Sequence, residues 1–232
     1  MNFKHWQQAL CAIGLAATAA VPAHATTTLT FDGIVPGMIL FAGDGVVHKG
    51  YSLTALNGVG VIDTAAAFGP GVGLDLAGPT GNPGPFYIGL NDSFLRMRAV
   101  NNSTFRVVGL DFGFVSALTN LFNPGDVPGF LIAAFEDGAG NFGGEAFSFG
   151  AADANGKFSF QSLGFAGVGS LTKALRAVDF YACTADASGQ CAAVNANFSQ
   201  FALDNIRIPE PGSLALVLAA LALTAGISRR KV

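Results

Sequence analysis

The chain has 232 residues and a formal net charge of −3, with 51% hydrophobic and only 12% charged residues. This length suits one domain with short appended segments. The high apolar content, which includes 21 Phe, excludes an intrinsically disordered chain, because such chains lack the apolar surface to form a core. The slightly acidic charge excludes a polybasic nucleic-acid-binding protein, so no nucleic-acid partner is expected.

The first 25 residues have the pattern of a secretory signal peptide. Lys4 supplies the positive start, an apolar run covers 9–21, and Ala23 and Ala25 form a small-x-small cleavage site. Signal peptides combine these three parts in this order. We therefore expect signal peptidase to remove residues 1–25 during export. The alternative is a buried helix of the folded domain.

The last 24 residues, 209–232, contain a short motif, an apolar stretch and a basic end. The motif is Pro209-Glu210-Pro211, and the basic residues are Arg229, Arg230 and Lys231. A helix over 211–228 would be about 27 Å long, enough to span a thin membrane. Positive residues favour the cytoplasmic side, so we expect the folded domain outside. The alternative is a terminal helix that packs on the domain.

This segment resembles the PEP-CTERM sorting signal of Gram-negative bacteria, a tail that is also called an ice-binding-protein C-terminal domain without implying ice binding. The resemblance implies an exported protein that is held briefly in the inner membrane. An exosortase-type membrane peptidase would process it near Glu210, where the flanking prolines keep the backbone extended. It also implies a final location at the cell surface or outside the cell, in bacteria that make extracellular polysaccharide.

Removing both ends leaves 26–208 as the folded domain. Fifteen acidic residues less Glu210 leave fourteen, and twelve basic residues less Lys4 and the three at the C-terminus leave eight, so this domain carries about −6. One His, His48, and two Cys remain, which excludes His-rich and thiolate zinc sites. No Gly-x-Ser-x-Gly elbow is present to make a catalytic triad. We therefore expect no enzyme.

The two remaining cysteines, Cys183 and Cys191, bracket a small polar loop. In an exported protein this arrangement favours a disulfide that closes a turn. A redox-active pair is the alternative, but the Cys-x-x-Cys spacing that it needs is absent. The chain-entropy relation gives about 2.5 kcal/mol of stabilisation for so short a loop.

Apolar and polar residues alternate with a period of two through much of the domain, which is typical of strands with one face in a core. Asn57-Gly58 and Asn155-Gly156 mark hairpin turns. Many short strands without a long helix predict an all-β fold, a two-sheet antiparallel sandwich of jelly-roll type. The segment 69–85, rich in Gly and Pro, is expected to be an irregular loop over one end. The expected strands are roughly 27–32, 46–54, 59–63, 86–90, 94–100, 105–115, 129–136, 145–150, 157–165, 174–183 and 198–208.

The domain opens with Thr30-Phe31-Asp32-Gly33 and closes with Leu203-Asp204-Asn205-Ile206. Both motifs resemble those of domains often attached to this sorting signal, and they imply a carbohydrate-binding-like sandwich. If Asp204 faces the core, its carboxylate needs a partner or a metal. Asp32, Asp204 and Asn205 supply the oxygen ligands that a structural calcium ion takes. The alternatives are a bulge that turns Asp204 to solvent, or an Asp that caps a turn.

Two further sets of residues are candidates for contact with glycans. A retaining glycosidase needs two carboxylates about 5 Å apart, and Glu136 and Glu145, on either side of a Gly-rich turn, are the available pair; the alternatives are a plain hairpin and a calcium loop. Sugar recognition uses aromatic faces. The domain has no Trp, which leaves Tyr51, Tyr87 and Tyr181 as candidates, or as half-buried sheet residues.

The sequence thus favours an exported, surface-sorted, non-enzymatic protein associated with extracellular polysaccharide or biofilm matrix. One alternative is an extracellular glycan hydrolase that uses Glu136 and Glu145. The other is a structural or adhesive surface protein, which would carry an exposed apolar patch or an unpaired edge strand.

Overall fold

The computed structural model describes residues 26–71, 73–117, 122–165, 169–186, 188–191 and 200–209. Contacts within the chain define a compact unit, Thr28–Ile208, and a second unit made of Met1–Thr27 and Pro209–Val232. The predicted signal peptide with Ala23 and Ala25, the motif residues Glu210 and Pro211, the apolar span and the basic end lie outside the described residues. Within the described residues, no helix is long and apolar enough to cross a membrane.

The domain is built from two large sheets, which we call sheets A and B. Sheet A contains β1 (Thr26–Leu29), β2 (Met38–Phe41), β5 (Val59–Asp63), β7 (Phe86–Leu90), β9 (Gly109–Phe114), β13 (Gln161–Gly164) and β15 (Phe201–Pro209). Sheet B contains β3 (Gly45–His48), β4 (Tyr51–Leu56), β8 (Phe94–Ala99), β11 (Gly129–Asp137), β12 (Phe142–Ser148) and β14 (Leu175–Thr184). The short elements are β6 (Leu76–Ala77), β10 (Ser116–Ala117), and the 3-10 turns η1 (Ala65–Ala67) and η2 (Ser170–Thr172).

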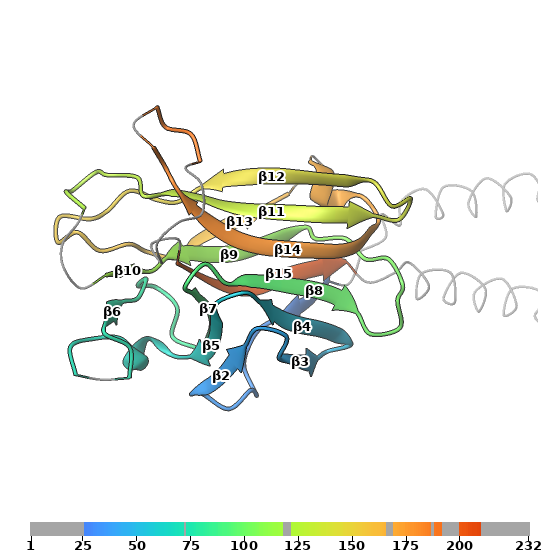
Figure 1. Ribbon diagram of the computed structural model, residues 1–232, viewed down its shortest axis with the longest axis horizontal. Helices are drawn as coiled ribbons and strands as arrows, with labels where there is room; N and C mark the ends of the chain where they lie inside the picture. Colours follow the sequence, from blue (N-terminus) through green and yellow to red (C-terminus); the bar gives the residue numbers. More distant parts are fainter. Residues whose placement is uncertain are drawn as a thin grey trace, which may run out of the picture. The chain divides into compact units, whose positions relative to one another are not determined.

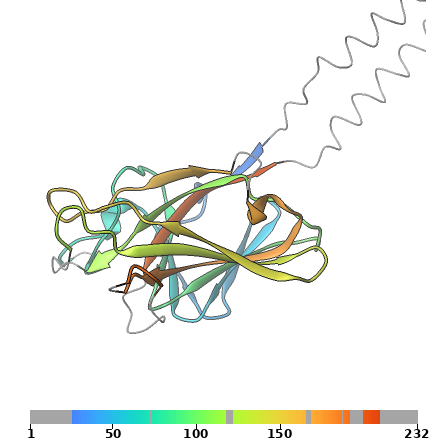
Figure 2. The same ribbon diagram turned by 90° about the horizontal axis from the view of Figure 1, so that it is seen from above.

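The two sheets stack as an antiparallel sandwich, which confirms the predicted all-β, two-sheet architecture (Figures 1 and 2). The strand order is β13-β9-β15-β7-β5-β2 in sheet A, with β1 also paired to β15, and β12-β11-β14-β8-β4-β3 in sheet B. Apolar side chains of both sheets pack in one core. Those of sheet B include Leu53, Leu95, Leu131 and Phe180, and those of sheet A include Tyr87, Phe112, Phe114 and Phe201. The alternating apolar residues therefore fill the space between the sheets.

Some strands differ from those that the sequence predicts. The expected strand 46–54 is split into the hairpin β3–β4, because Lys49 and Gly50 both have positive φ, 46° and 83°, as in a type I′ turn. The expected strand 105–115 is regular only from Gly109. β2 is absent from the predicted strands, because its run Met38–Phe41 is apolar throughout and does not alternate.

The Gly- and Pro-rich segment is largely irregular, as predicted, and it packs on the outer face of sheet A. Phe68, Leu74 and Leu76 pack on a second apolar cluster, which belongs to the outer face of sheet A and includes Phe86 and Ile88. Gly78 permits this arrangement, since a Cβ there would lie 2.5 Å from the Phe68 ring. The outer face of sheet A is therefore covered over β5 and β7.

Candidate functional site

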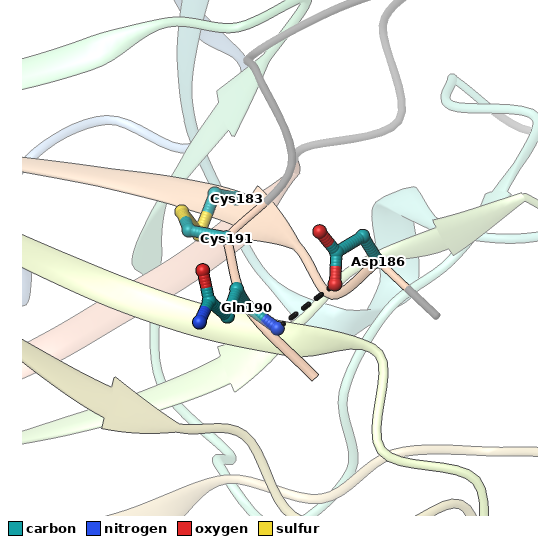
Figure 3. Close-up of a disulfide and its surroundings, with 4 residues drawn as sticks. All are labelled: Cys183, Asp186, Gln190 and Cys191. Carbon is teal, nitrogen blue, oxygen red and sulfur yellow. Dashed lines mark hydrogen bonds between the residues drawn. A yellow bond between two sulfur atoms is a disulfide. The ribbon is translucent and has the colours of Figure 1, made fainter. Parts of the chain in front are cut away.

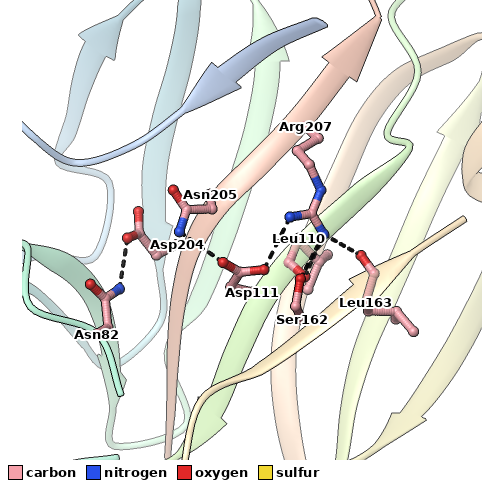
Figure 4. A network of polar contacts seen from close by, with 8 residues as sticks. All are labelled: Asn82, Leu110, Asp111, Ser162, Leu163, Asp204, Asn205 and Arg207. Atoms are coloured by element: carbon pink, nitrogen blue, oxygen red, sulfur yellow. Dashed lines mark hydrogen bonds and ion pairs between the residues drawn. The ribbon is translucent and has the colours of Figure 1, made fainter. Parts of the chain in front are cut away.

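Asp204 is a buried carboxylate in β15, with 4% of its surface exposed. Its Oδ2 accepts a hydrogen bond of 2.7 Å from Asn82 Nδ2 (Figure 4). Its Oδ1 accepts one of 3.4 Å from the N–H of Phe31. Burial raises the pKa of Asp204 and the nearby charge of Asp32 adds to the rise, while these hydrogen bonds oppose it. The carboxylate is thus held by a neutral amide and the backbone.

Asn205 points away from this pair. It has a φ of 49° at a bulge between Asp204 and Arg207, and its Nδ2 donates to Asp111 Oδ2 at 2.7 Å. Arg207 Nη1 pairs with Asp111 Oδ1 at 3.2 Å, and Arg207 Nη2 donates to the carbonyl of Leu163 at 2.6 Å (Figure 4). The closing motif therefore ties β15 to β9 and β13 on one side and to Asn82 and Phe31 on the other.

The residues proposed for calcium do not form a fitting ligand set. Asp32 and Asp204 lie close together, but Asn205 is committed to Asp111, and Asn82 presents its amide nitrogen to Asp204. In the described part of the chain, no cluster of three or more His, Cys, Asp or Glu side chains is present that could hold a metal. Calcium takes about six to eight oxygen ligands, and this donor set falls well short.

The predicted glycosidase pair is wrong, because Glu136 and Glu145 lie on opposite faces of sheet B. Glu136 pairs with Phe142, whereas Glu145 pairs with Ala133, which points into the core. Glu136 faces outward and forms an ion pair with Arg176 at 3.6 Å. Glu145 accepts a hydrogen bond from the N–H of Ser170 at the edge of the sandwich. A retaining glycosidase needs both carboxylates in one cleft.

Three loops, which start at Asp137, Asp153 and Asp186, share one hydrogen-bond pattern. In each, the Asp Oδ1 accepts from the N–H groups two and four residues later, at 2.8–3.0 Å. A glycine three residues after each Asp has a positive φ. Hydrogen bonds to the carboxylates, led by those from Asn141, Lys157 and Ser188 respectively, lower the pKa of each Asp. The acidic loop after Glu136 is therefore a hairpin turn.

The predicted disulfide is confirmed: Cys183 and Cys191 are bonded, with their Cα atoms 5.6 Å apart (Figure 3). Cys183 lies on the outward face of β14, opposite Phe130, and yet it is fully buried. The loop that the disulfide closes therefore covers it. Gln190 N donates to Asp186 Oδ1 at 3.0 Å and fixes the turn of that loop.

Only one of the three candidate tyrosines faces outward. Tyr87 is buried, its hydroxyl bonds to Ser93 Oγ at 3.0 Å, and burial raises its pKa to about 12. Tyr51 packs edge-on against Phe105 on the core side, with ring centroids 5.5 Å apart. Tyr181 alone lies on the outward face of sheet B, half-buried, where its ring stacks on Phe94 with centroids 4.5 Å apart.

Tyr181 and Phe94 belong to an ordered surface that we call the sheet B platform. Strand registers and the ring contact align two rows across the outward face. The aromatic row comprises Ala146, Ile132, Tyr181, Phe94 and Leu56, and the polar row comprises Gly144, Ala134, Asp179, Arg96 and Thr54. Alternation places Arg96 outward between Leu95 and Met97, but the apolar run of β11 gives no such signal for Ile132 or Ala134. Alternation also carries no signal for which residues lie side by side.

Arg96 and Asp179 form the centre of the polar row. Arg96 Nε donates to Asp179 Oδ1 at 2.7 Å, and Arg96 Nη2 donates to Asp179 Oδ2 at 2.6 Å. The hydrogen bond to Asp179 is the main cause that raises the pKa of Arg96. Burial, followed by the charge of Asp179, raises the pKa of Tyr181, so its hydroxyl remains a donor at neutral pH.

A hollow of about 420 Å³ is lined by residues of 65–81 and by Lys157. Its lining is apolar or glycine except for Thr80 and Lys157. The Thr80 hydroxyl is already bonded to Ser159 Oγ at 2.9 Å. Ligand pockets place several convergent polar groups around an apolar floor, and this hollow does not.

No family model matches this chain, and no curated protein matches it. Among solved structures, it is similar to a DUF4465 family protein from Bacteroides caccae, with a TM-score of 0.51, 10% identity and coverage of 81% of this chain and 100% of the other. CtCBM11, a carbohydrate-binding module, aligns over 82% of this chain and 97% of its own, at 13% identity and a TM-score of 0.29. The first likeness shows a shared β-sandwich fold, and the second is too weak to bear on what this chain binds.

Proposed function

We propose that this chain is an exported, surface-sorted, non-enzymatic β-sandwich protein that associates with extracellular polysaccharide or biofilm matrix. The main observation in support of export is the Cys183–Cys191 disulfide, since such bonds persist in oxidising compartments outside the cytoplasm. The signal-like first 25 residues and the sorting-like segment 209–232 support the same route. The inner membrane would hold the protein only transiently through 211–228.

Processing by an exosortase-type peptidase is tested in the producing bacterium. The full chain, tagged after the signal peptide, is followed by cell fractionation and immunoblotting beside a Glu210→Ala variant. We expect the wild type at the cell surface or in the medium, and the variant retained in the inner membrane at higher mass. Identical distribution and mass of the two proteins would contradict sorting through this motif.

The association with polysaccharide is supported by the sandwich fold and by the outward aromatic pair, Tyr181 and Phe94. The separation of Glu136 from Glu145 removes the specific pair that favoured a hydrolase. Retention of the purified protein on polysaccharide extracted from the producing bacterium tests the proposal. Failure to bind that material would contradict it.

An adhesive role is a second candidate, because apolar side chains are exposed on two edge strands. Ile39 and Phe41 of β2 are 55% and 62% exposed, and Val47 of β3 is 69% exposed. Each of these strands lies at the edge of its sheet, where an unpaired backbone can pair with another chain. Sedimentation analysis of the protein and of an Ile39→Lys variant tests this role: self-association that the variant abolishes would favour it.

A further inference from the structure

We propose that the sheet B platform binds an uncharged polysaccharide chain that lies across the strands. The inference rests on the proposed association with extracellular polysaccharide and adds the site and the ligand class. The two outward faces of the sandwich differ in a way that points to this site. Sheet A carries an apolar cover that includes Phe68 and Leu76. On sheet B, Tyr181 and Phe94 stay partly exposed, and no helix or strand of the described residues packs over them.

The aromatic row supplies a flat apolar track. It crosses five strands, from Ala146 on β12 to Leu56 on β4, which is a length of about 19 Å at the usual strand spacing of ~4.8 Å. Tyr181 and Phe94 stand at its centre. The C–H faces of sugar rings are apolar and pack on aromatic side chains, so a track of this length accommodates several sugar residues in line.

The polar row supplies donors and acceptors beside that track. Asp179 and Arg96 stand two residues from Tyr181 and Phe94 along the same strands, about 6.7 Å away. The ion pair uses two of the guanidinium N–H groups, while an arginine side chain has about five donors. Sugar hydroxyls both donate and accept hydrogen bonds. They can bond to the remaining N–H groups of Arg96, to the free lone pairs of Asp179 and to the Tyr181 hydroxyl.

The charges of the platform favour an uncharged ligand. Arg96 is neutralised by Asp179, and Glu136 by Arg176. Arg98, which lies beside Ser52 on the same face, adds one positive charge, but the folded domain as a whole carries about −6. A polyuronate would meet Asp179, Glu136 and this negative field, which repels acidic chains.

The disulfide-closed loop bounds one side of the platform. Cys183 follows Tyr181 by two positions on the same face of β14, and the loop that ends at Cys191 covers it. A chain seated on the aromatic row therefore lies against this loop. The disulfide holds the loop beside the row, and its loss would weaken binding before it unfolds the domain.

Affinity electrophoresis of the full chain in detergent tests the proposal, in gels that contain galactomannan, hydroxyethyl cellulose, alginate or the extracted polysaccharide. We expect a neutral polymer to retard the protein, and we expect added salt to leave this retardation unchanged. Tyr181→Ala and Arg96→Gln are expected to weaken it about tenfold. Phe41→Ala, which removes an exposed aromatic ring from sheet A, is the matched control and should bind like the wild type. Tyr181→Phe and Arg96→Lys keep the packing and separate lost contacts from lost folding.

The outcomes distinguish the site from the function. Equal retardation of the wild type and all platform variants would overturn the site and leave the association with polysaccharide standing. Absence of retardation of the wild type in every gel would overturn the proposed function itself. Stronger, salt-sensitive retardation by alginate would overturn the ligand class.

Discussion

Arg96 and Asp179 face each other across β8 and β14, joined by two parallel hydrogen bonds of 2.7 and 2.6 Å. The planar guanidinium matches the two carboxylate oxygens, a geometry that an ammonium group does not reproduce. Their side chains are 37% and 19% exposed, so solvent weakens the Coulomb attraction between them. The pair therefore contributes orientation more than stability.

Replacing Arg96 with Lys should show that the ion pair contributes little to stability. The variant keeps the charge but loses the two-pronged contact, and we expect the free energy of unfolding to fall by only about 0.5–1 kcal/mol. Urea unfolding followed by circular dichroism measures the change, with Asp179→Asn as the reciprocal variant. A loss several times larger would show that the pair holds sheet B together.

Exchanging Asn82 and Asp204 tests the buried amide–carboxylate contact. Asp204→Asn alone replaces one of the two acceptor oxygens with an NH2 group, so either the Asn82 amide or the Phe31 N–H loses its acceptor, which should cost about 1–3 kcal/mol. Asn82→Asp alone sets two carboxylates together and should cost at least as much. The double variant restores one donor and one acceptor, so its loss in urea unfolding should be smaller than the sum of the two single losses. Strict additivity would mean that the two side chains do not interact.

The three Asp loops should make the protein sensitive to acid. The folded-state pKa values of Asp137, Asp153 and Asp186 are lowered. Their contribution is therefore present above the unfolded pKa of about 3.9 and is lost as pH falls through the lowered values. The triple Asp→Asn variant should show a flatter dependence of unfolding free energy on pH in this acid range. Parallel pH profiles for the two proteins would contradict the assignment.

The pKa of Asp204 is shifted in the opposite direction from those of the three loop Asp residues. Its folded pKa is raised, so its ionisation costs stability as pH rises from the unfolded value through the raised one, and the cost stays constant above. A variant without this carboxylate should lack that decline. Urea unfolding of Asp204→Asn across this pH range measures the effect, because the double exchange would keep a carboxylate in the same contact.

Removal of the disulfide should cost about 2.5 kcal/mol, because the short loop gains entropy chiefly in the unfolded chain. The Cys183→Ala/Cys191→Ala variant is compared with the wild type by urea unfolding, with and without reductant. Reductant should lower the stability of the wild type towards that of the variant and leave the variant unchanged. A variant as stable as the oxidised protein would contradict the expected entropic gain.

Calcium should leave the melting temperature unchanged, because Asn205 is bonded to Asp111, Asn82 turns its nitrogen towards Asp204, and the described part of the chain has no group of three or more His, Cys, Asp or Glu side chains that could hold a metal. Thermal unfolding with calcium and with a chelator measures this. A rise with calcium that disappears in Asp204→Ala would establish a native-state cation site.

The sequence predicts the sandwich well where alternation or a buried apolar run defines a strand, as in β5 and β7. It does not predict β2, because the four apolar residues of that strand do not alternate with polar ones. It also misses the hairpin turn at Lys49-Gly50, because the usual Asn-Gly signal is absent there. Asn57-Gly58 is a turn as predicted, with positive φ at both residues, but it joins β4 to β5, which belong to different sheets.

The site is less predictable than the fold, because it depends on contacts between distant segments. The disulfide follows from spacing and export alone. Alternation groups Asp204 with Ile206 and Ile208, but Asp204 pairs with Asp111 on the outer face of sheet A, and the bulge at Asn205 brings Ile206 and Ile208 to the core. Asn82 comes from a loop with no local signal, and the contact of Tyr181 with Phe94 depends on the pairing of β14 with β8.

β15 lies inside sheet A, between β9 on one side and β7 and β1 on the other. A pull applied at Pro209 along this strand would load the hydrogen bonds to its neighbours in shear, all at once, instead of peeling them one by one from an edge. Ile206 and Ile208, fully buried in the core, would have to slide with it. If the domain is tethered through this strand, as the proposed sorting implies, a pull at Pro209 acts on a strand that is paired on both sides.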